Sequence, residues 1–117
     1  MKVSFEGIGE NVVTFYNKAA AGSAVVGAPV KMTGNGEVGV CVDGDKFIGL
    51  AIACDAGLAA VQTEGYVQMK YSGAEAPKVG FAMLAAAAEG KVKTAAAGRE
   101  YLVVDVDTAN TSVGFML

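Results

Sequence analysis

The stretch that most constrains the fold is the run from Phe47 to Tyr71, in which a short polar link joins two apolar segments. The first segment is Phe47–Cys54, the second is Leu58–Tyr71, and Asp55-Ala56-Gly57 separates them. Apolar segments on either side of a short Asp/Gly link are typical of a β-hairpin. Both faces of the first arm are apolar, which predicts a core on one side and a partner surface on the other. We therefore expect this hairpin at the centre of the fold.

The second arm of this hairpin has one drier and one wetter face. The drier face carries Val61, Thr63, Gly65, Val67 and Met69, and the wetter face carries Ala60, Gln62, Glu64, Tyr66, Gln68 and Lys70. This alternation is typical of a half-buried strand. Glycine inside a long strand usually marks a bulge or a bend, so we expect one at Gly65.

A second hairpin precedes the central one. Ala28–Thr33 and Glu37–Val42 flank Gly34-Asn35-Gly36, and Asn-Gly is the strongest short hairpin signal. Pro29, which has no N–H to donate, suits the start of an edge strand. Asp43-Gly44-Asp45 predicts the next turn, so that the strand ending at Val42 would pair with Phe47–Cys54.

The C-terminal third alternates short strands and turns. Val79–Leu84 and Lys91–Lys93 are expected strands, and Ala85–Ala88 between them favours one or two helical turns. Tyr101–Asp107 and Thr111–Leu117 flank a polar turn and predict a closing hairpin.

These segments together predict the fold class and the domain organisation. About nine short, mostly antiparallel strands with turns every 8–12 residues indicate an all-β small barrel or sandwich with little helix. No strand–helix–strand alternation supports a parallel α/β sheet. We expect residues 1–20 to form an N-terminal arm or first strand, with Asn11–Tyr16 extended, and residues 21–117 to form a single β-barrel or sandwich domain.

Composition excludes several classes of function. The 12 acidic and 9 basic residues give a net charge of −3, spread without blocks, which argues against binding nucleic acid through its phosphates. No apolar run reaches the roughly 18 residues of a membrane helix, and the N-terminus has no apolar core of a secretory signal. The chain has no histidine, the commonest general base and zinc ligand.

The two cysteines, Cys41 and Cys54, are not expected to form a disulfide. If Cys41 lies opposite Ile48 in a hairpin, Cys54 falls six residues further along, about 20 Å away at the usual strand rise. We interpret both as small buried hydrophobic residues of a protein in a reducing compartment.

Two pairs of carboxylates are candidate chemical sites. Asp43 and Asp45 flank a glycine as in a calcium loop, but the further oxygen ligands and closing glutamate are missing, so an ordinary turn is favoured. Asp105 and Asp107 share a strand face, and a solvated face is favoured over acid–base catalysis. The sequence predicts no catalytic residue, no metal site and no cofactor, and therefore no enzyme.

One lysine suggests an alternative function. Lys70 in Val67-Gln-Met-Lys-Tyr71 lies next to a methionine. The small β-barrels that carry biotin or lipoate have their modified lysine at a hairpin tip, often next to a methionine. The acidic residue and second methionine of that pattern are missing, and a solvated lysine at a strand end is the favoured reading.

A succession of short sequence segments resembles a known family. The resemblance spans nearly the whole chain from about Gly22. The segments are Val26–Val30, Asp45–Ala51, Ala60–Val67, Ala76–Phe81, Gly90–Lys93, Tyr101–Asp107 and Ser112–Leu117. In this order and spacing they resemble the capsid cement, or head decoration, proteins of phages and prophages.

The resemblance implies a β-rich structural protein of the virion that binds the major capsid protein on the outside of an assembled head. It further implies a homo-oligomer, commonly a trimer, made in the cytoplasm of the bacterial host. Another phage structural role, such as a tail-tube or connector subunit, stays open. The N-terminal segment is detached from the main turn pattern and is our candidate for contact with the capsid or a partner. Its apolar residues are Val3, Phe5, Ile8, Val12, Val13, Phe15 and Tyr16.

Overall fold

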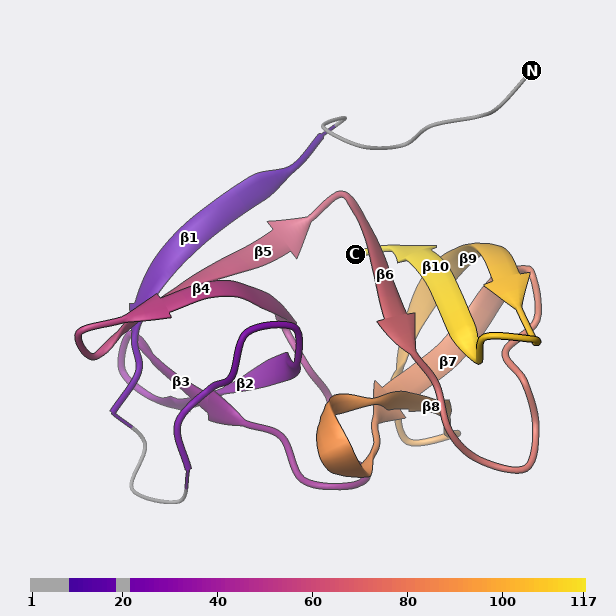
Figure 1. Cartoon of the computed structure of the whole chain (residues 1–117), viewed down its shortest axis with the longest axis horizontal. Coiled ribbons are helices and arrows are strands. Elements are labelled where there is room, and N and C mark those ends of the chain that lie inside the picture. The colour runs from indigo at the N-terminus through magenta and orange to yellow at the C-terminus, as the bar shows by residue number, and fades with distance from the viewer. Residues whose placement is uncertain (1–8, 19–21) are drawn as a thin grey trace.

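Ten β-strands and one short 3₁₀ turn make up the computed structural model, which describes residues 9–18 and 22–117 (Figure 1). The strands are β1 (Asn11–Tyr16), β2 (Pro29–Gly34), β3 (Glu37–Val40), β4 (Gly49–Asp55), β5 (Leu58–Glu64), β6 (Tyr66–Lys70), β7 (Gly80–Ala86), β8 (Val92–Thr94), β9 (Arg99–Asp107) and β10 (Ser112–Met116), with the 3₁₀ turn at Ala88–Gly90. The all-β class predicted from the sequence is confirmed, with ten strands where about nine were expected.

The first five strands form a closed barrel in the order β1-β3-β2-β4-β5, on the left of Figure 1. Two predicted hairpins build it. β2 and β3 pair antiparallel around Asn35-Gly36, and β4 and β5 pair antiparallel around Ala56-Gly57. Ala56 and Gly57 both have positive φ (51° and 79°), as a two-residue hairpin turn that matches the twist of its strands requires.

The predicted pairing of β3 with β4 is wrong. β2 lies between them, and it pairs with β3 on one edge and with β4 on the other. For the same reason Pro29 does not lie on an edge strand. It is the first residue of β2, where the ladder can do without its missing N–H. The turn itself exists, because Asp45 N–H donates to Val42 O (3.1 Å), but the chain then crosses to the far side of β2.

The last five strands form a second sheet in the order β6-β10-β9-β7-β8 (right of Figure 1). The expected long arm Leu58–Tyr71 is divided between the two sheets: it breaks at Gly65 into β5 of the barrel and β6 of the second sheet. The bend predicted at Gly65 is thus confirmed, and this residue has φ +95°. Gln62, expected on the wet face, is buried because its amide donates to Glu64 O and Tyr66 O (3.1 Å each) across this bend.

The helical turns expected at Ala85–Ala88 are wrong for most of that segment. Ala85 and Ala86 continue β7 and pair with Lys93 and Val92 of β8. Both alanines are fully buried, so tertiary packing overrides their helix propensity. Only the short 3₁₀ turn that begins at Ala88 is helical.

Two hydrophobic cores lie inside these two units. The barrel core consists of small side chains: Ala24, Val30, Val38, Ala51, Ala59 and Val61, with Phe15, Ile48 and Cys54 packed against it. The core under the second sheet is larger and holds Phe47, Val67, Met69, Tyr71, Leu84, Ala86, Val92, Tyr101, Val103, Val113 and Phe115. Leu50 of the barrel packs against this second core, so the two units share a packed boundary.

The loop before β4 joins the two units. The Phe47 ring stacks on Tyr101 with centroids 5.1 Å apart, and the Tyr101 hydroxyl donates to Phe47 O (3.0 Å). Ala86 N–H donates to Asp45 O, while Gly44 N–H donates to Ala86 O (2.8 Å each). On the barrel side Ile48 N–H donates to Val30 O (2.9 Å), so this loop bonds to both units.

Candidate docking surfaces

The predicted contact segment is partly described by the structure. Val3, Phe5 and Ile8 lie outside the described residues. In β1, Val12, Val13 and Tyr16 are 49%, 43% and 52% exposed, which is high for large apolar side chains. Phe15 differs from them because it is partly buried against the barrel core.

The exposed residues of β1 do not share one face. Val12 and Tyr16 lie opposite Gln62 and Leu58 of β5 and point away from the barrel interior. Val13 lies opposite the buried Val61 and so points inward, although it is itself 43% exposed. Tyr16 and the exposed Leu58 are cross-strand neighbours and form the apolar part of the outer face.

One edge of β1 is open along most of its length. β1 pairs with β5 from Asn11 to Tyr16, but with β3 only through the parallel pair Tyr16↔Glu37. Tyr16 N–H donates to Gly36 O on the β3 side (2.8 Å). Backbone groups of alternate residues point the same way, so the N–H and C=O of Thr14 also face this side, where no strand of the described chain lies beside them. An open strand edge of this kind can pair with a strand of another chain.

A second exposed apolar surface comprises side chains on the outer face of the second sheet and the residue that precedes β7. We call it the β7 patch and define it as Val79, Phe81, Met83 and Leu102, which are 69%, 74%, 36% and 38% exposed. Phe81 lies directly opposite Leu102 of β9 in the ladder. Met116 is the next cross-strand neighbour of Leu102 and extends the row onto β10.

Sequence reasoning did not identify the β7 patch. Strand alternation in Val79–Leu84 does separate the large residues at 79, 81 and 83 from Gly80 and Ala82. By size alone the large set would be assigned to the core. In the structure Ala82 points inward, because it lies opposite Tyr101, whose ring already fills that space. The bulky partner on β9 therefore decides which face of β7 is exposed.

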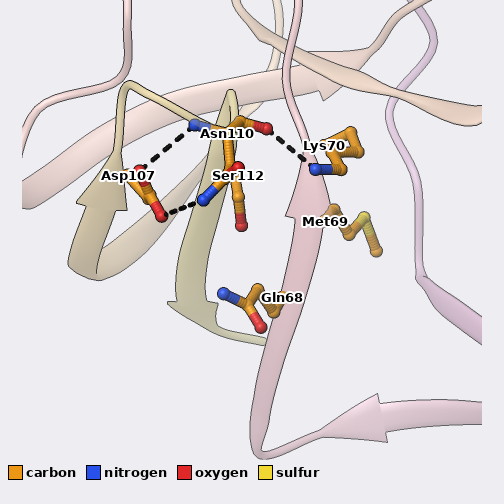
Figure 2. Close-up of a pocket in the computed structure, with 6 residues that line it drawn as sticks. All are labelled: Gln68, Met69, Lys70, Asp107, Asn110 and Ser112. Atoms are coloured by element: carbon orange, nitrogen blue, oxygen red, sulfur yellow. Dashed lines mark hydrogen bonds between the residues drawn. The ribbon is translucent and has the colours of Figure 1, made fainter.

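Lys70, the residue of the carrier alternative, lies in a shallow open depression of about 340 Å³, drawn in Figure 2. It ends β6, and its amine donates to Asn110 O (2.8 Å). Asp107 accepts bonds from the Asn110 side-chain amide (2.8 Å) and backbone N–H (3.2 Å), and these bonds hold the pKa of its carboxyl below the usual range. The modified lysine of carrier domains sits at a hairpin tip, whereas Lys70 pairs with Ser112 within the sheet.

The other carboxylates singled out in the sequence have partners of their own. Asp105 accepts a hydrogen bond from the Tyr66 hydroxyl (3.0 Å). Asp43 pairs with Lys93 at 2.8 Å, and Asp45 pairs with Lys31 at 2.6 Å. Among residues 9–18 and 22–117 no three Cys, Asp or Glu side chains come close enough together to hold a metal ion.

The Lys31–Asp45 pair also has electrostatic consequences. The Lys31 ammonium, followed by the Val42 N–H, holds the pKa of Asp45 below its ordinary value. The same bond raises the pKa of Lys31. Because Lys31 lies in β2 and Asp45 in the joining loop, the pair ties the barrel to that loop.

Both cysteines are free, as predicted, although the hairpin on which their separation was reasoned does not form. Burial raises the pKa of the Cys41 thiol to about 11, so it stays protonated at neutral pH and is a poor nucleophile. The Cys54 thiol donates to Ala24 O (3.5 Å) in the barrel.

Comparisons with protein-family models, with curated proteins and with solved structures give no match to this chain. No helix in the described part of the chain is long and apolar enough to cross a membrane.

Proposed function

We propose that this chain is a structural phage protein that binds the outside of an assembled capsid and stabilises it without catalysis. Its partner is the major capsid protein, and it functions in the virion after synthesis in the bacterial cytoplasm. The family resemblance supplies the identity of this partner. The observation that carries the proposal is the open edge of β1, flanked by the exposed side chains of Val12 and Tyr16.

The contact requires both edge pairing and burial of apolar side chains. Main-chain hydrogen bonds along an added strand give affinity, and the alternating side chains give specificity. Apolar burial contributes about 25 cal/mol per Å², most of which is offset by the entropy lost on association. The small net binding free energy that is left at each site is repeated over the many equivalent sites of a shell. Through this avidity the bound protein helps the shell to resist outward pressure. Self-association, with a trimer favoured by the resemblance, adds to this avidity.

The test uses purified heads that lack this protein, mixed with the chain and sedimented. We expect the wild-type chain to pellet with the heads to saturation. Thr14→Pro removes the N–H on the open edge of β1 and leaves its bonds to β5, so it should weaken head binding at least tenfold. Thr14→Ala keeps that N–H and is the matched control, with binding close to wild type.

Two results would count against the proposal. Wild-type chain that stays in the supernatant at all concentrations would exclude capsid binding. Thr14→Pro that binds heads like Thr14→Ala would exclude the β1 edge. Urea unfolding of each variant confirms that it is folded, and Val12→Glu tests the same surface without any change to the backbone.

A further inference from the structure

Half of β7 has no strand beside it on one edge. β8 pairs with β7 only at Leu84, Ala85 and Ala86. Met83 O accepts a hydrogen bond from Ala95 N–H on that side (3.1 Å). Backbone groups of alternate residues point the same way, so Phe81 N–H and C=O face this edge, beyond the last residue pair with β8. An exposed apolar edge of this kind favours pairing with another strand.

A groove of about 400 Å³ runs along this open edge. Phe81 and Met83 of the β7 patch form one side of it. The rest of the lining includes the small side chains Ala76, Ala95 and Ala96. A highly exposed phenylalanine thus lies beside a groove that is walled by alanines. The surface carries both a projecting ring and the space to receive one, which is the arrangement that a two-fold contact between identical surfaces requires.

The charges at this groove are balanced. Glu75 and Lys78 line it and contribute one charge of each sign. Two copies that meet here therefore bring no net charge of one sign together at the groove, and a two-fold arrangement lets a lysine of each copy face a glutamate of the other. Opposite charges at the rim of an interface favour the correct partner and contribute little affinity.

The exposed area of the β7 patch sets the affinity that we expect for the contact. The exposed parts of the four residues of the β7 patch offer on the order of 400 Å² per copy, given that a large aromatic side chain alone can bury about 150 Å². A standard stable interface buries about 800 Å² per partner. The contact is therefore expected to be weak and concentration-dependent in solution.

We propose that the β7 patch binds the β7 patch of a second copy of this chain about a two-fold axis near Phe81. Each Phe81 ring enters the groove of the other copy, beside the part of the β7 edge that β8 leaves open. This contact gives a dimer, whereas the trimer favoured by the resemblance needs a different, heterologous contact. The inference does not depend on capsid binding.

The test is sedimentation velocity over a range of protein concentrations. For the wild-type chain we expect the weight-average mass to rise from one chain toward two. Phe81→Glu places a charge at the axis and should weaken association at least tenfold without unfolding, because this side chain is 74% exposed. Val26→Glu makes the same kind of change at a 56% exposed valine outside the second sheet and should associate like wild type.

A cross-linking variant gives an independent readout. Phe81→Cys places one thiol of each copy near the two-fold axis, and a disulfide forms only when their Cα atoms come within about 7 Å. We expect a covalent dimer after mild oxidation, and none for Val26→Cys.

Several outcomes would overturn the inference. These are a monomeric wild-type chain at all concentrations, Phe81→Glu that associates like wild type, or a Phe81-dependent trimer. A monomeric wild-type chain whose Phe81→Glu variant loses head binding would assign this face to the capsid instead. Thr14→Pro keeps the dimer under this inference even when it loses head binding, so the two proposals fail separately.

Discussion

The barrel and the second sheet each have five strands, yet they bury very different side chains. The barrel core contains only alanine and valine among its fully buried members. The second core holds an aromatic cluster in which the centroids of Phe47, Tyr101 and Phe115 lie 5.1 to 6.1 Å apart. Aromatic side chains bury the most area per residue and gain further from ring contacts. The second sheet therefore provides most of the hydrophobic stabilisation of this chain.

The two units also differ at the seam, by which we mean the line where β1 meets β3 in the barrel and where the segment after β6 meets β8 in the second sheet. In each unit a single parallel residue pair crosses the seam. This pair is Tyr16↔Glu37 in the barrel and Tyr71↔Val92 in the second sheet. In the second sheet Ser72 N–H donates to Val92 O (2.9 Å) beside that pair, and Tyr71 is a buried core residue. In the barrel β1 keeps an open edge and exposed valines. The unit with the larger core is thus also packed at its seam, whereas the barrel keeps a strand edge open.

The largest expected effect comes from the aromatic cluster. Phe115→Ala removes a fully buried ring and should lower the free energy of unfolding by about 3–5 kcal/mol. Val61→Ala, the matched change in the barrel core, removes two methyl groups and should cost about 2 kcal/mol. Urea unfolding followed by circular dichroism measures both. Equal losses, or a larger loss in the barrel, would contradict the comparison.

The next effect tests strand packing within the barrel, at the first residue of β4. Gly49 begins β4, and a Cβ there would overlap the backbone oxygen of Gln62 on the neighbouring strand. Gly49→Ala should therefore lower the free energy of unfolding by about 1–3 kcal/mol. This cost is typical of overpacking, because the backbone of Gln62 cannot move aside for the added methyl group. Gly34→Ala is the control, because its Cβ meets only the Glu37 side chain, at an ordinary 3.5 Å or more. If both variants unfold at the same urea concentration, strand packing at Gly49 is looser than described.

The smallest effect concerns the Lys31–Asp45 pair. Because the folded pKa of Asp45 is lowered, its contribution to stability is present above its ordinary pKa of 3.8 and is lost as the pH falls through the folded value. The raised pKa of Lys31 keeps the contribution in place up to about 10.5. Asp45→Asn should therefore be less stable than wild type between these limits and approach it in acid. Urea midpoints measured against pH would refute this if the difference persisted at pH 2.

Much of this fold was predictable from local chemistry. Asn35-Gly36 and Asp55-Ala56-Gly57 specify their hairpins through turn conformation, and the closing hairpin follows from the β-branched residues of Tyr101–Asp107. Gly65 was identified as a bend, but its role as the crossing point between two sheets was not. That role depends on which distant strand receives β6, and β6 pairs with β10, more than forty residues away in sequence.

The unpredicted features all depend on non-local packing. The insertion of β2 between β3 and β4 is a choice of neighbour that no local turn determines. Ala85 and Ala86 are extended because they pair with β8 and fill a tight space, against their intrinsic preference. Phe81 is exposed because Tyr101 occupies the interior beside Ala82. The sequence singles out β1 because this segment is detached from the main turn pattern, and its role in contact stays a prediction. The β7 patch is not predicted because its strand resembles a core strand.

The most direct measurement is electron cryo-microscopy of heads incubated with the purified chain. The account predicts density for this protein on the outer surface of the shell, with the open edge of β1 against the major capsid protein and the aromatic core of the second sheet intact. A bare shell, density confined to a tail tube or connector, or bound protein whose β1 edge faces solvent would contradict it.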